Sequence, residues 1–551
     1  MSILKNYSLI LLLIIVLASL LRLPALGQLP VGITIDEAGQ GLSAYSILKT
    51  GKDEWGDFLP LNPRGFGDYK PPVFMYLLVP SIWIFGLTEF AVRFPSAIAG
   101  ILTVGIIYLL ISDLFKNRTL GLLSALLMAI SPWHVYYSRL GWESNIGLMF
   151  FILGIWLFIK GVEKAKYLSF SVLSFGLAAL SYHSFKLLVP LMVISLVIIF
   201  WNQIKTIKKQ SFIPAFSIVL VLAIIVGYGF LFSGASRRAA DQSILKEENL
   251  SGLRQNQVED GLPTPLNKVL YNRYQFLVTK VTDNYLGYYS FSFLFGPHRS
   301  DGSILNFPSM GLLYIWQLPL LLLGIWYLIK NKSKASAVIF SWLLIAPIPA
   351  AITQDYMHAG RAQAILPAFT IISTVGLYYL SELIKSRNNK KILLVSATVI
   401  IGLSVLWRID NYLFHTFNRQ LGGLTQGHKE IVEYTKANYD KYDKIIFTKG
   451  QSEPHGFVGF YGGATPEEIQ EASGAWKKFE TDGLRFLDMT DYNLGKYEFK
   501  NVDYSRDRNE KNALIIAVPK EIPELVIPKF KINDISGKTV FVVIDTNEIP
   551  E

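Results

Sequence analysis

Long blocks of apolar residues recur along this chain of 551 residues, and they constrain its fold more than any other feature of the sequence. A block of about twenty apolar residues can cross the hydrocarbon core of a bilayer as one helix. Only 17% of the residues are charged, whereas a soluble chain carries about a quarter. We therefore predict a polytopic all-α membrane bundle of about eleven transmembrane helices. The predicted spans lie near residues 7–26, 93–113, 119–135, 144–160, 167–184, 185–201, 211–232, 309–329, 336–353, 361–384 and 391–408.

Basic residues cluster in the short loops between these spans. Cytoplasmic loops carry an excess of Lys and Arg, so the formal net charge of +10 indicates orientation and not a nucleic-acid partner. All clusters fall on one side only if the short apolar segment 73–88, which contains Pro80, lies along the interface or re-enters. We accordingly predict a multi-pass membrane protein with a cytoplasmic N-terminus; the plasma membrane as its location is implied only by a family resemblance described below. The clusters are Lys5, Lys116/Arg118, Lys160/Lys164/Lys166, Lys205/Lys208/Lys209, Lys330/Lys332/Lys334 and Lys385/Arg387/Lys390/Lys391.

The same orientation places the long polar stretches on the extracytoplasmic side. They include a first outer loop, 27–92, and a large outer loop, 233–308, which is too long to be a plain connector. Within the large loop, apolar residues recur at helical spacing over 266–295. We predict a helix there that lies on the outer face of the bundle.

The composition changes to a mixture of polar and apolar residues after residue 408. We therefore predict two domains, a transmembrane catalytic module over 1–408 and a small extracytoplasmic α/β domain over 409–551. Short apolar runs separated by Gly, Pro and Asp indicate strands, and apolar residues at helical spacing among polar ones indicate an amphipathic helix. The predicted helix is His428–Asn438, and the predicted strands are Lys444–Thr448, Ala513–Val518 and Thr539–Ile544.

Two adjacent carboxylates, Asp36 and Glu37, directly follow the first span. Ionisable groups near hydrocarbon are costly and usually functional. The alternative is that Asp36 only caps a helix that starts near Glu37.

Other outer loops supply cations and further polar groups that can converge on these carboxylates. A carboxylate can take the proton of an acceptor hydroxyl as that hydroxyl attacks. Lys and Arg can neutralise a phosphate leaving group, more strongly where the dielectric is low. We predict one pocket at the outer leaflet that combines these groups, although the arginines could be interfacial anchors and Glu143 could simply pair with Arg139. The converging residues are Asp36, Glu37, Lys70, Arg93, Glu143, His358 and Arg361.

The runs DEAGQGLSAYSILKTGKDEWGDFLP and DYKPPVFMYLLVPSIWIFGLTEFAVRFPSAIAG carry a resemblance to a known superfamily. Their acid pair, Lys-Pro-Pro and Gly-x-x-Glu-Phe-x-x-Arg resemble the N-terminal signature of polytopic GT-C glycosyltransferases. The most similar groups are the protein O-mannosyltransferases and the aminoarabinose transferases that act on lipid A, the family 39 and 83 type. SPWHVYYSRLGWESN and, more loosely, HAGRAQAILPAF extend the resemblance over about residues 5–380.

The resemblance implies catalytic roles for the acidic residues. Asp36 matches the catalytic acid of the first loop, which acts as the base for the acceptor, and Glu37 is its companion. Glu143 falls where the family carries a second acidic residue, commonly Asp.

The resemblance also implies which residues bind the donor phosphate. Lys70 matches the lysine that meets the lipid-linked phosphate in the aminoarabinose enzymes, and Arg93 matches the arginine after the first loop in the mannosyltransferases. His358 and Arg361 lie in an outer loop that the family places near the phosphate. The aminoarabinose enzymes hold a metal with an acid just before the lysine, but this chain has Tyr69 there. We therefore predict no metal ligands and no required cofactor, while a divalent metal with Asp68 as a substitute ligand stays open.

The implied reaction moves a monosaccharide from a polyprenyl-phosphate donor to an acceptor on the extracytoplasmic face, with inversion at the anomeric carbon. The acceptor is a protein, a lipid or a glycan, and membrane lipids are the other partners. Three alternatives stay open. They are a ligase for longer lipid-linked glycans, a lipid or solute transporter that uses the three acids, and a membrane-anchored binding protein whose function resides in 409–551.

Overall fold

The computed structural model describes residues 6–65, 69–232, 272–296, 311–415, 425–451, 453–477 and 489–549, together with residues 244 and 265. The chain divides into two compact units. The first unit comprises Met1–Pro24, Ser96–Ser300 and Leu305–Ile409, and the second comprises Ala25–Pro95, Asp301–Ile304 and Asp410–Glu551. The second unit thus combines residues predicted as the first outer loop with residues predicted as the C-terminal domain.

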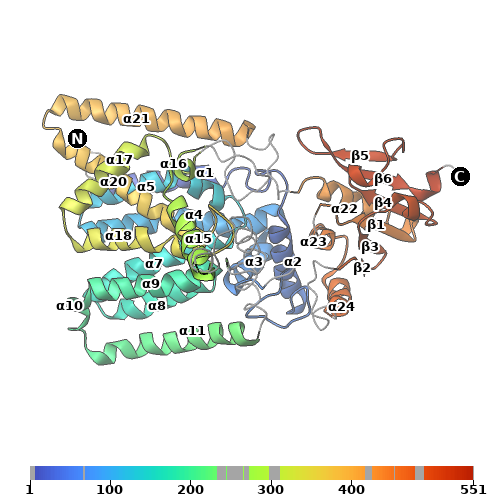
Figure 1. The fold of residues 1–551 in the computed structure, drawn as a ribbon, viewed down its shortest axis with the longest axis horizontal. Coiled ribbons are helices and arrows are strands. Elements are labelled where there is room, and N and C mark those ends of the chain that lie inside the picture. Colours follow the sequence, from blue (N-terminus) through green and yellow to red (C-terminus); the bar gives the residue numbers. More distant parts are fainter. Residues whose placement is uncertain are drawn as a thin grey trace. The chain divides into compact units, whose positions relative to one another are not determined.

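The first unit is helical throughout its described residues (Figure 1). Ser131 and Pro132 explain the break between its α5 and α6, because the Ser131 hydroxyl accepts the His134 N–H and Pro132 starts the new helix. Its helices are α1 (Tyr7–Arg22), most of α4 (Glu89–Phe115), α5 (Arg118–Ile130), α6 (Pro132–Ser138), α7 (Glu143–Glu163), α8 (Lys166–Ala179), α9 (His183–Ile199), α10 (Trp201–Ile204), α11 (Ile213–Phe232), α15 (Arg273–Gly287), α16 (Phe291–Leu294), α17 (Gln317–Lys330), α18 (Lys334–Ile345), α19 (Ile348–Ala351), α20 (Leu366–Leu383) and α21 (Arg387–Asp410).

Within the described residues, 6 helices are long and apolar enough to cross a membrane, judged by length and composition. The helices α5 and α6 meet at 59° and together can form a seventh span. Every predicted span overlaps one of these helices or one of the shorter apolar helices α1, α8, α9 and α17. The mostly helical architecture with several apolar helices is therefore confirmed, whereas the count of eleven spans stays a prediction.

Small residues mark the crossings inside this unit. A Cβ on Gly324 of α17 would lie 2.0 Å from the carbonyl oxygen of Ile372 in α20, and a Cβ on Gly376 would lie 2.0 Å from that of Leu320. Such close approach of two backbones is typical of helices that pack within membranes. By contrast, only 6% of the apolar window is buried in the spans Lys209–Gly227, which contains most of α11, and Arg387–Asp410, which is α21.

Apart from the single residues 244 and 265, the large outer loop is described over 272–296. Its α15 confirms a helix inside the predicted range 266–295, of which the part before residue 272 lies outside the described residues. The helix is attached at its C-terminal end, where Asn284 donates to the carbonyl oxygens of Ala351 and Thr353. Tyr274 and Val278 nearer its start are 80% and 65% exposed. We expected the apolar side of this helix to lie along the bundle. The exposure of Tyr274 and Val278 contradicts that expectation for the described residues.

The second unit contains a six-stranded sheet in the order β2-β3-β1-β4-β6-β5 (Figure 1). The strands β3, β1 and β4 are parallel, and β2, β6 and β5 each run antiparallel to a neighbour. The predicted strands correspond to β1, β4 and β6, while β2, β3 and β5 were not predicted. The bounds are β1 (Lys444–Thr448), β2 (Asp491–Leu494), β3 (Tyr497–Lys500), β4 (Ala513–Ala517), β5 (Phe530–Asn533) and β6 (Thr539–Asp545).

The central strands β1 and β4 are buried on both faces of the sheet. In β1, Ile445 and Phe447 join one apolar cluster while Ile446 joins another on the opposite face, as the alternation of side chains along a strand requires. The first cluster also contains Leu42 and Trp55 from the first outer loop, so this loop shares a core with the sheet. The helices of the unit are α2 (Ile35–Thr50), α3 (Pro72–Phe85), α22 (His428–Ala437), α23 (Pro454–Phe460), α24 (Pro466–Trp476) and α26 (Tyr504–Asp507).

Glycines allow α2 and α23 to pack closely. A Cβ on Gly41 would lie 2.8 Å from the ring of Phe460, and a Cβ on Gly459 would lie 2.6 Å from Leu42. The helix that carries Asp36 and Glu37 is therefore held against the C-terminal domain by contacts that leave no room for a larger side chain.

Candidate functional site

The acid pair lies in the first turn of α2. Thr34 is the N-cap, because its hydroxyl accepts the Glu37 N–H at 3.0 Å and the Glu37 carboxylate accepts the Thr34 N–H at 3.0 Å. This reciprocal capping box satisfies two backbone donors at the helix start. The alternative in which Asp36 caps this helix is therefore wrong, and the Asp36 side chain is available for another role.

Asp36 forms an ion pair with Lys70. The distance from Lys70 Nζ to Asp36 Oδ1 is 2.9 Å, and the side chains are 10% and 42% exposed. Lys70 directly precedes the Pro71–Pro72 start of α3, and its backbone N–H bonds the Pro63 carbonyl at 2.8 Å. The backbone of Lys70 is thus held by this hydrogen bond and by the two prolines that follow it, while the Asp36 side chain remains partly exposed.

Glu37 and Arg93 form a second ion pair with a different environment. Arg93 Nε lies 2.9 Å from Glu37 Oε1, and both side chains are fully buried. The remaining guanidinium nitrogens donate to the carbonyl oxygens of Leu26, Pro30 and Gly32. The pair therefore ties the start of α4 to α2 and to the segment before it. These contacts favour a structural role over the catalytic and phosphate-binding roles predicted for Glu37 and Arg93.

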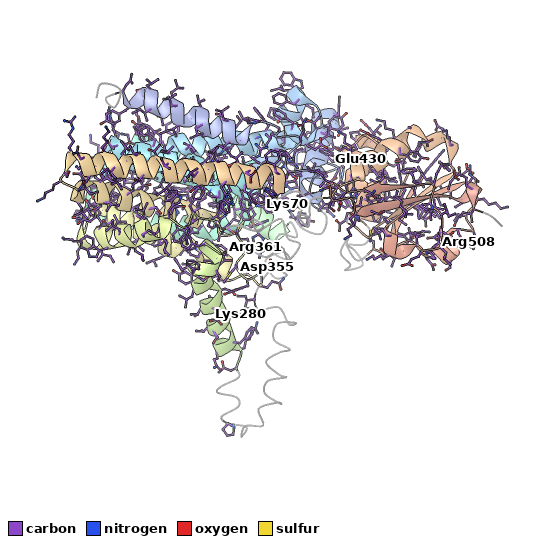
Figure 2. The ribbon with its side chains drawn as sticks, turned by 90° about the horizontal axis from the view of Figure 1, so that it is seen from above. Lys70, Lys280, Asp355, Arg361, Glu430 and Arg508 are labelled. Carbon is purple, nitrogen blue, oxygen red and sulfur yellow. The ribbon has the colours of Figure 1, made fainter. Side chains whose placement is uncertain are left out.

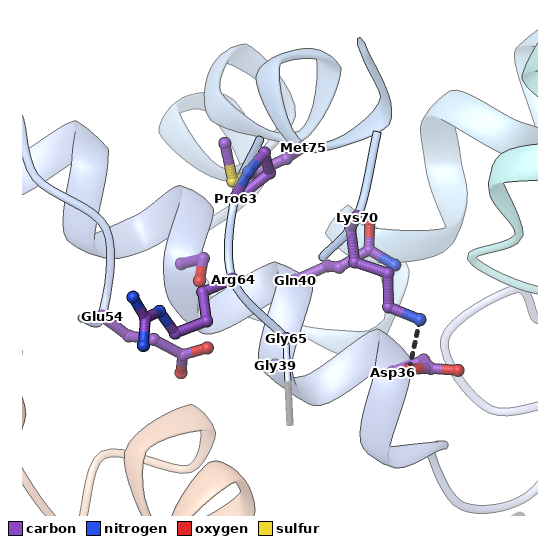
Figure 3. A pocket seen from close by; sticks show the side chains of 10 residues that line it. Asp36, Gly39, Gln40, Glu54, Pro63, Arg64, Gly65, Lys70 and Met75 are labelled. Atoms are coloured by element: carbon purple, nitrogen blue, oxygen red, sulfur yellow. Dashed lines mark ion pairs between the residues drawn. The ribbon is translucent and has the colours of Figure 1, made fainter. Parts of the chain in front are cut away.

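A small pocket opens beside the Asp36–Lys70 pair (Figure 3). Gln40 and Ser43 of α2 line it, as do Glu54 and Arg64. The sequence analysis did not select Glu54, although its adjacent acid pair with Asp53 after α2 repeats the signal that drew attention to Asp36 and Glu37. Glu54 is 3% exposed.

The third predicted acid, Glu143, is the first residue of α7 and is buried in the first unit. Its neighbours connect α7 to the loop that carries His358 and Arg361. Ser144 donates to Gln363 at 2.6 Å, and Gln363 donates to Asn145 at 3.2 Å. The structure therefore brings the start of α7 and the 352–365 segment together.

Arg361 pairs with Asp355 within this segment. The distance from Arg361 Nη2 to Asp355 Oδ2 is 2.7 Å, and the side chains are 11% and 49% exposed (Figure 2). His358 Nδ1 accepts the Arg361 backbone N–H at 3.2 Å, so the ring proton of the neutral imidazole lies on Nε2. Burial, together with the charge of Arg361, lowers the pKa of His358 to about 3. His358 is therefore uncharged at neutral pH and can offer a phosphate only one N–H.

The predicted residues thus fall into two groups. Asp36, Glu37, Lys70 and Arg93 come together in the second unit, and Glu143 stands beside the segment of His358 and Arg361 in the first. That the two groups form one pocket stays a prediction.

Tyr69 occupies the position of the acid before the lysine, and its ring lies under the Arg64 guanidinium at 5.5 Å. Within the described part of the chain, no cluster of three or more His, Asp or Glu side chains has metal-binding geometry. Asp68, the substitute ligand, lies outside the described residues.

One segment of the chain matches a known family. The model of the dolichyl-phosphate-mannose-protein mannosyltransferase family matches residues 69–228. Two proteins of Bacillus subtilis strain 168 with provisional mannosyltransferase names, YkcB and YycA, are 29% identical over 159 residues and 25% identical over 187 residues. These alignments cover 28% and 34% of this chain and 22% and 27% of the relatives. The chain therefore matches about a quarter of the relatives' length.

The fold resembles solved glycosyltransferase structures. ArnT from Cupriavidus metallidurans matches with a TM-score of 0.54 in the apo state, at 13% identity and 100% coverage of both chains. The same protein bound to undecaprenyl phosphate matches with a TM-score of 0.52, at 12% identity and 98% coverage of both. The Archaeoglobus fulgidus oligosaccharyltransferase tethered to an acceptor peptide matches at 0.51, with 14% identity, 83% coverage of this chain and 63% of that chain. The resemblance to GT-C glycosyltransferases is confirmed in one sequence segment and in the fold.

Proposed function

We propose that this chain, which shares a mannosyltransferase-type segment and a fold with GT-C glycosyltransferases, is itself an integral-membrane glycosyltransferase. It moves a monosaccharide from a polyprenyl-phosphate donor to an acceptor on the extracytoplasmic face, with inversion at the anomeric carbon. The family match over 69–228 and the likeness to ArnT support the class of reaction. An ArnT structure that contains undecaprenyl phosphate supports the class of donor.

The observation that carries the proposal is the ion pair of Asp36 and Lys70 at the edge of a pocket. Asp36 and Lys70, whose charged groups are 2.9 Å apart, can act on the two oxygens of a glycosyl transfer. One is the acceptor oxygen, which forms a bond to the anomeric carbon, and the other is the phosphate oxygen, whose bond to that carbon breaks. Asp36 is the more exposed partner and suits the incoming acceptor. Lys70 is the more buried partner, so its interaction with a phosphate is strengthened by the low dielectric.

In the proposed step, the acceptor oxygen forms a bond to the anomeric carbon as the bond from that carbon to the phosphate oxygen breaks. The acceptor proton passes to the Asp36 carboxylate. The electron pair of the broken bond leaves with the polyprenyl phosphate, whose charge Lys70 stabilises. The buried Glu37–Arg93 pair holds the helix start, so Asp36 keeps its direction while substrates bind and leave.

The test is transfer from radiolabelled polyprenyl-phosphate monosaccharides by the purified full-length chain, compared with Asp36→Asn. We expect the variant to lose about 10²–10⁴-fold in rate, as for removal of a general base, while donor binding persists. A matched control is Asp57→Asn, because Asp57 lies in the same loop, is 46% exposed and pairs with Lys477 at 2.9 Å. Equal losses in both variants would contradict the role of Asp36.

The product mass separates this proposal from the ligase alternative. Each turnover should add one monosaccharide to the acceptor, whereas a ligase would add a longer glycan. If the wild-type chain transfers no sugar from any polyprenyl-phosphate monosaccharide but transports the intact lipid across a vesicle membrane, the transporter alternative replaces the proposal.

A further inference from the structure

A buried carboxylic acid faces the same pocket as Asp36 and Lys70. Glu54 lies in the turn that follows α2, and its carboxyl group lines the pocket (Figure 3). Its Oε2 has no hydrogen-bond partner among the residues that the structure describes. A buried polar atom without a partner is rare in native proteins and requires an explanation.

The fold of the turn does not explain Glu54, because neighbouring residues already fix it. Asp53 Oδ1 accepts the backbone N–H groups of Trp55 at 3.0 Å and Asp57 at 2.9 Å, which closes the turn. Gln470 from α24 donates to the Asp53 carbonyl at 3.0 Å and anchors the turn to the C-terminal domain. Asp53 is therefore the structural acid of this pair. Glu54 interacts with the side chains of Ser43 and Trp55, and its Oε2 keeps no partner among the described residues.

The ionisation of Glu54 differs from that of an ordinary carboxylate. Burial, reinforced by the nearby Asp53 carboxylate, raises the pKa of Glu54 well above its usual value. Burial therefore favours the protonated form of Glu54 over the carboxylate to a higher pH than for an ordinary glutamic acid. A protonated carboxyl offers both an O–H donor and a carbonyl acceptor.

Two uncharged groups that can both donate and accept hydrogen bonds also line the pocket. Gln40 (Figure 3) and Ser43, both from α2, line the pocket together with Glu54, Asp36 and Lys70. Arg64 lines it as well, and its guanidinium stacks 5.5 Å from the Trp55 ring. The space open to the centre of a water-sized molecule is about 10 Å³, which is about one water. A hydroxyl group has that size and the same ability to donate and accept.

We propose that Glu54, with Gln40 and Ser43, forms a subsite for one hydroxyl group of a carbohydrate that binds beside Asp36 and Lys70. The inference rests on the proposed function. It adds a hydroxyl-binding group of side chains to the Asp36–Lys70 pair. The subsite is specific for hydroxyl groups because a ligand that lacks the hydroxyl leaves the buried polar atoms without partners.

The test compares the full donor sugar with a series of monodeoxy donors, each as a polyprenyl phosphate, in wild type and in Glu54→Leu. We expect wild type to prefer the full donor over one deoxy donor by about 10–100-fold in kcat/KM. In Glu54→Leu this preference should fall to about one, because the partner of that hydroxyl is gone. Glu54→Gln, which keeps a donor and an acceptor, should retain more of the preference than Glu54→Leu.

The same comparison with deoxy acceptors identifies the source of the hydroxyl. Loss of preference for a deoxy donor assigns the subsite to the transferred sugar, and loss for a deoxy acceptor assigns it to a carbohydrate acceptor. If Glu54→Leu lowers kcat/KM by the same factor for every donor and acceptor, its role is structural and the subsite is overturned. That result leaves the proposed function intact, whereas absence of wild-type transfer contradicts the proposed function itself.

Discussion

Two regions of the molecule each contain an ion pair, and the two pairs have similar distances and similar exposure. In the first outer loop, the Lys70 and Asp36 side chains are 10% and 42% exposed, and their charged atoms are 2.9 Å apart. In the 352–365 segment, the Arg361 and Asp355 side chains are 11% and 49% exposed, and their charged atoms are 2.7 Å apart. Their surroundings differ. The first pair borders a pocket with a buried carboxylic acid whose pKa is raised, whereas the second lies beside an uncharged histidine whose Nδ1 accepts a backbone hydrogen bond. An ion pair alone therefore does not identify a catalytic residue, and the groups around it decide what it can do.

The largest difference should appear when the two carboxylates are neutralised. We expect Asp36→Asn to lower the rate of transfer by about 10²–10⁴-fold. Asp355→Asn should lower it by less than about fivefold, because a half-exposed ion pair contributes only about 0–1 kcal/mol. Steady-state transfer by the two purified variants, at saturating donor, measures both effects. Similar large losses in both would show that the second pair also takes part in the chemistry.

The first region also contains a buried ion pair, for which the 352–365 segment has no counterpart among its described contacts. We expect Glu37→Gln to lower the free energy of unfolding by about 3–5 kcal/mol, because it leaves the Arg93 charge buried without its carboxylate. Asp36→Asn should change it by less than about 1 kcal/mol. Thermal unfolding in detergent checks this difference between adjacent residues. Equal midpoints for the two variants would contradict the structural role of Glu37.

The two cations should differ in their effect on the donor. Lys70→Ala should raise the donor KM by about 10–100-fold, since a hydrogen bond to a charged group contributes about 1.5–3 kcal/mol. Arg361→Ala should raise it by less than about fivefold if Asp355 is its principal partner. Lys477→Ala provides a control for loss of an outer lysine. A KM increase at Arg361 as large as that at Lys70 would support the phosphate contact that the sequence resemblance implies.

Much of the fold follows from patterns that the sequence displays directly. The apolar runs of β1, β4 and β6 are buried on both faces, so they stand out, whereas β2, β3 and β5 alternate with Asp491, Glu498 and Lys531 and resemble loops. The break at Pro132 divides one predicted span into α5 and α6. Helix existence was therefore more predictable than helix count.

The sequence predicted the residue types of the site but not which residue has which role. Asp36 and Glu37 are adjacent and similar, yet only the fold brings Arg93, 56 positions along the chain, against one of them. Glu54 carried the same sequence signal, but its burial depends on α2 and on the turn anchored by Gln470. Such assignments depend on long-range packing, which the spacing of residues does not encode.

The smallest expected effect concerns His358 and pH. Because burial lowers its pKa to about 3 from an ordinary value of about 6.5, the unfolded chain binds a proton between these values that the folded chain does not. Stability contributed by the neutral ring is therefore complete above about pH 6.5 and is lost as the pH falls toward 3. His358→Asn should flatten this loss. We expect thermal midpoints of the variant to decrease less than those of wild type between pH 7.5 and 5.

The reduction should be partial, because His428 and His455 in the C-terminal domain are also buried, with pKa values of about 3. Transfer activity should show no titration of His358 between pH 6 and 8, because its charged form is not populated there. A His358-dependent step in the pH profile within that range would mean that the imidazolium forms next to Arg361 when the donor phosphate is bound. The 352–365 segment would then resemble the first outer loop in function as well as in the shape of its ion pair.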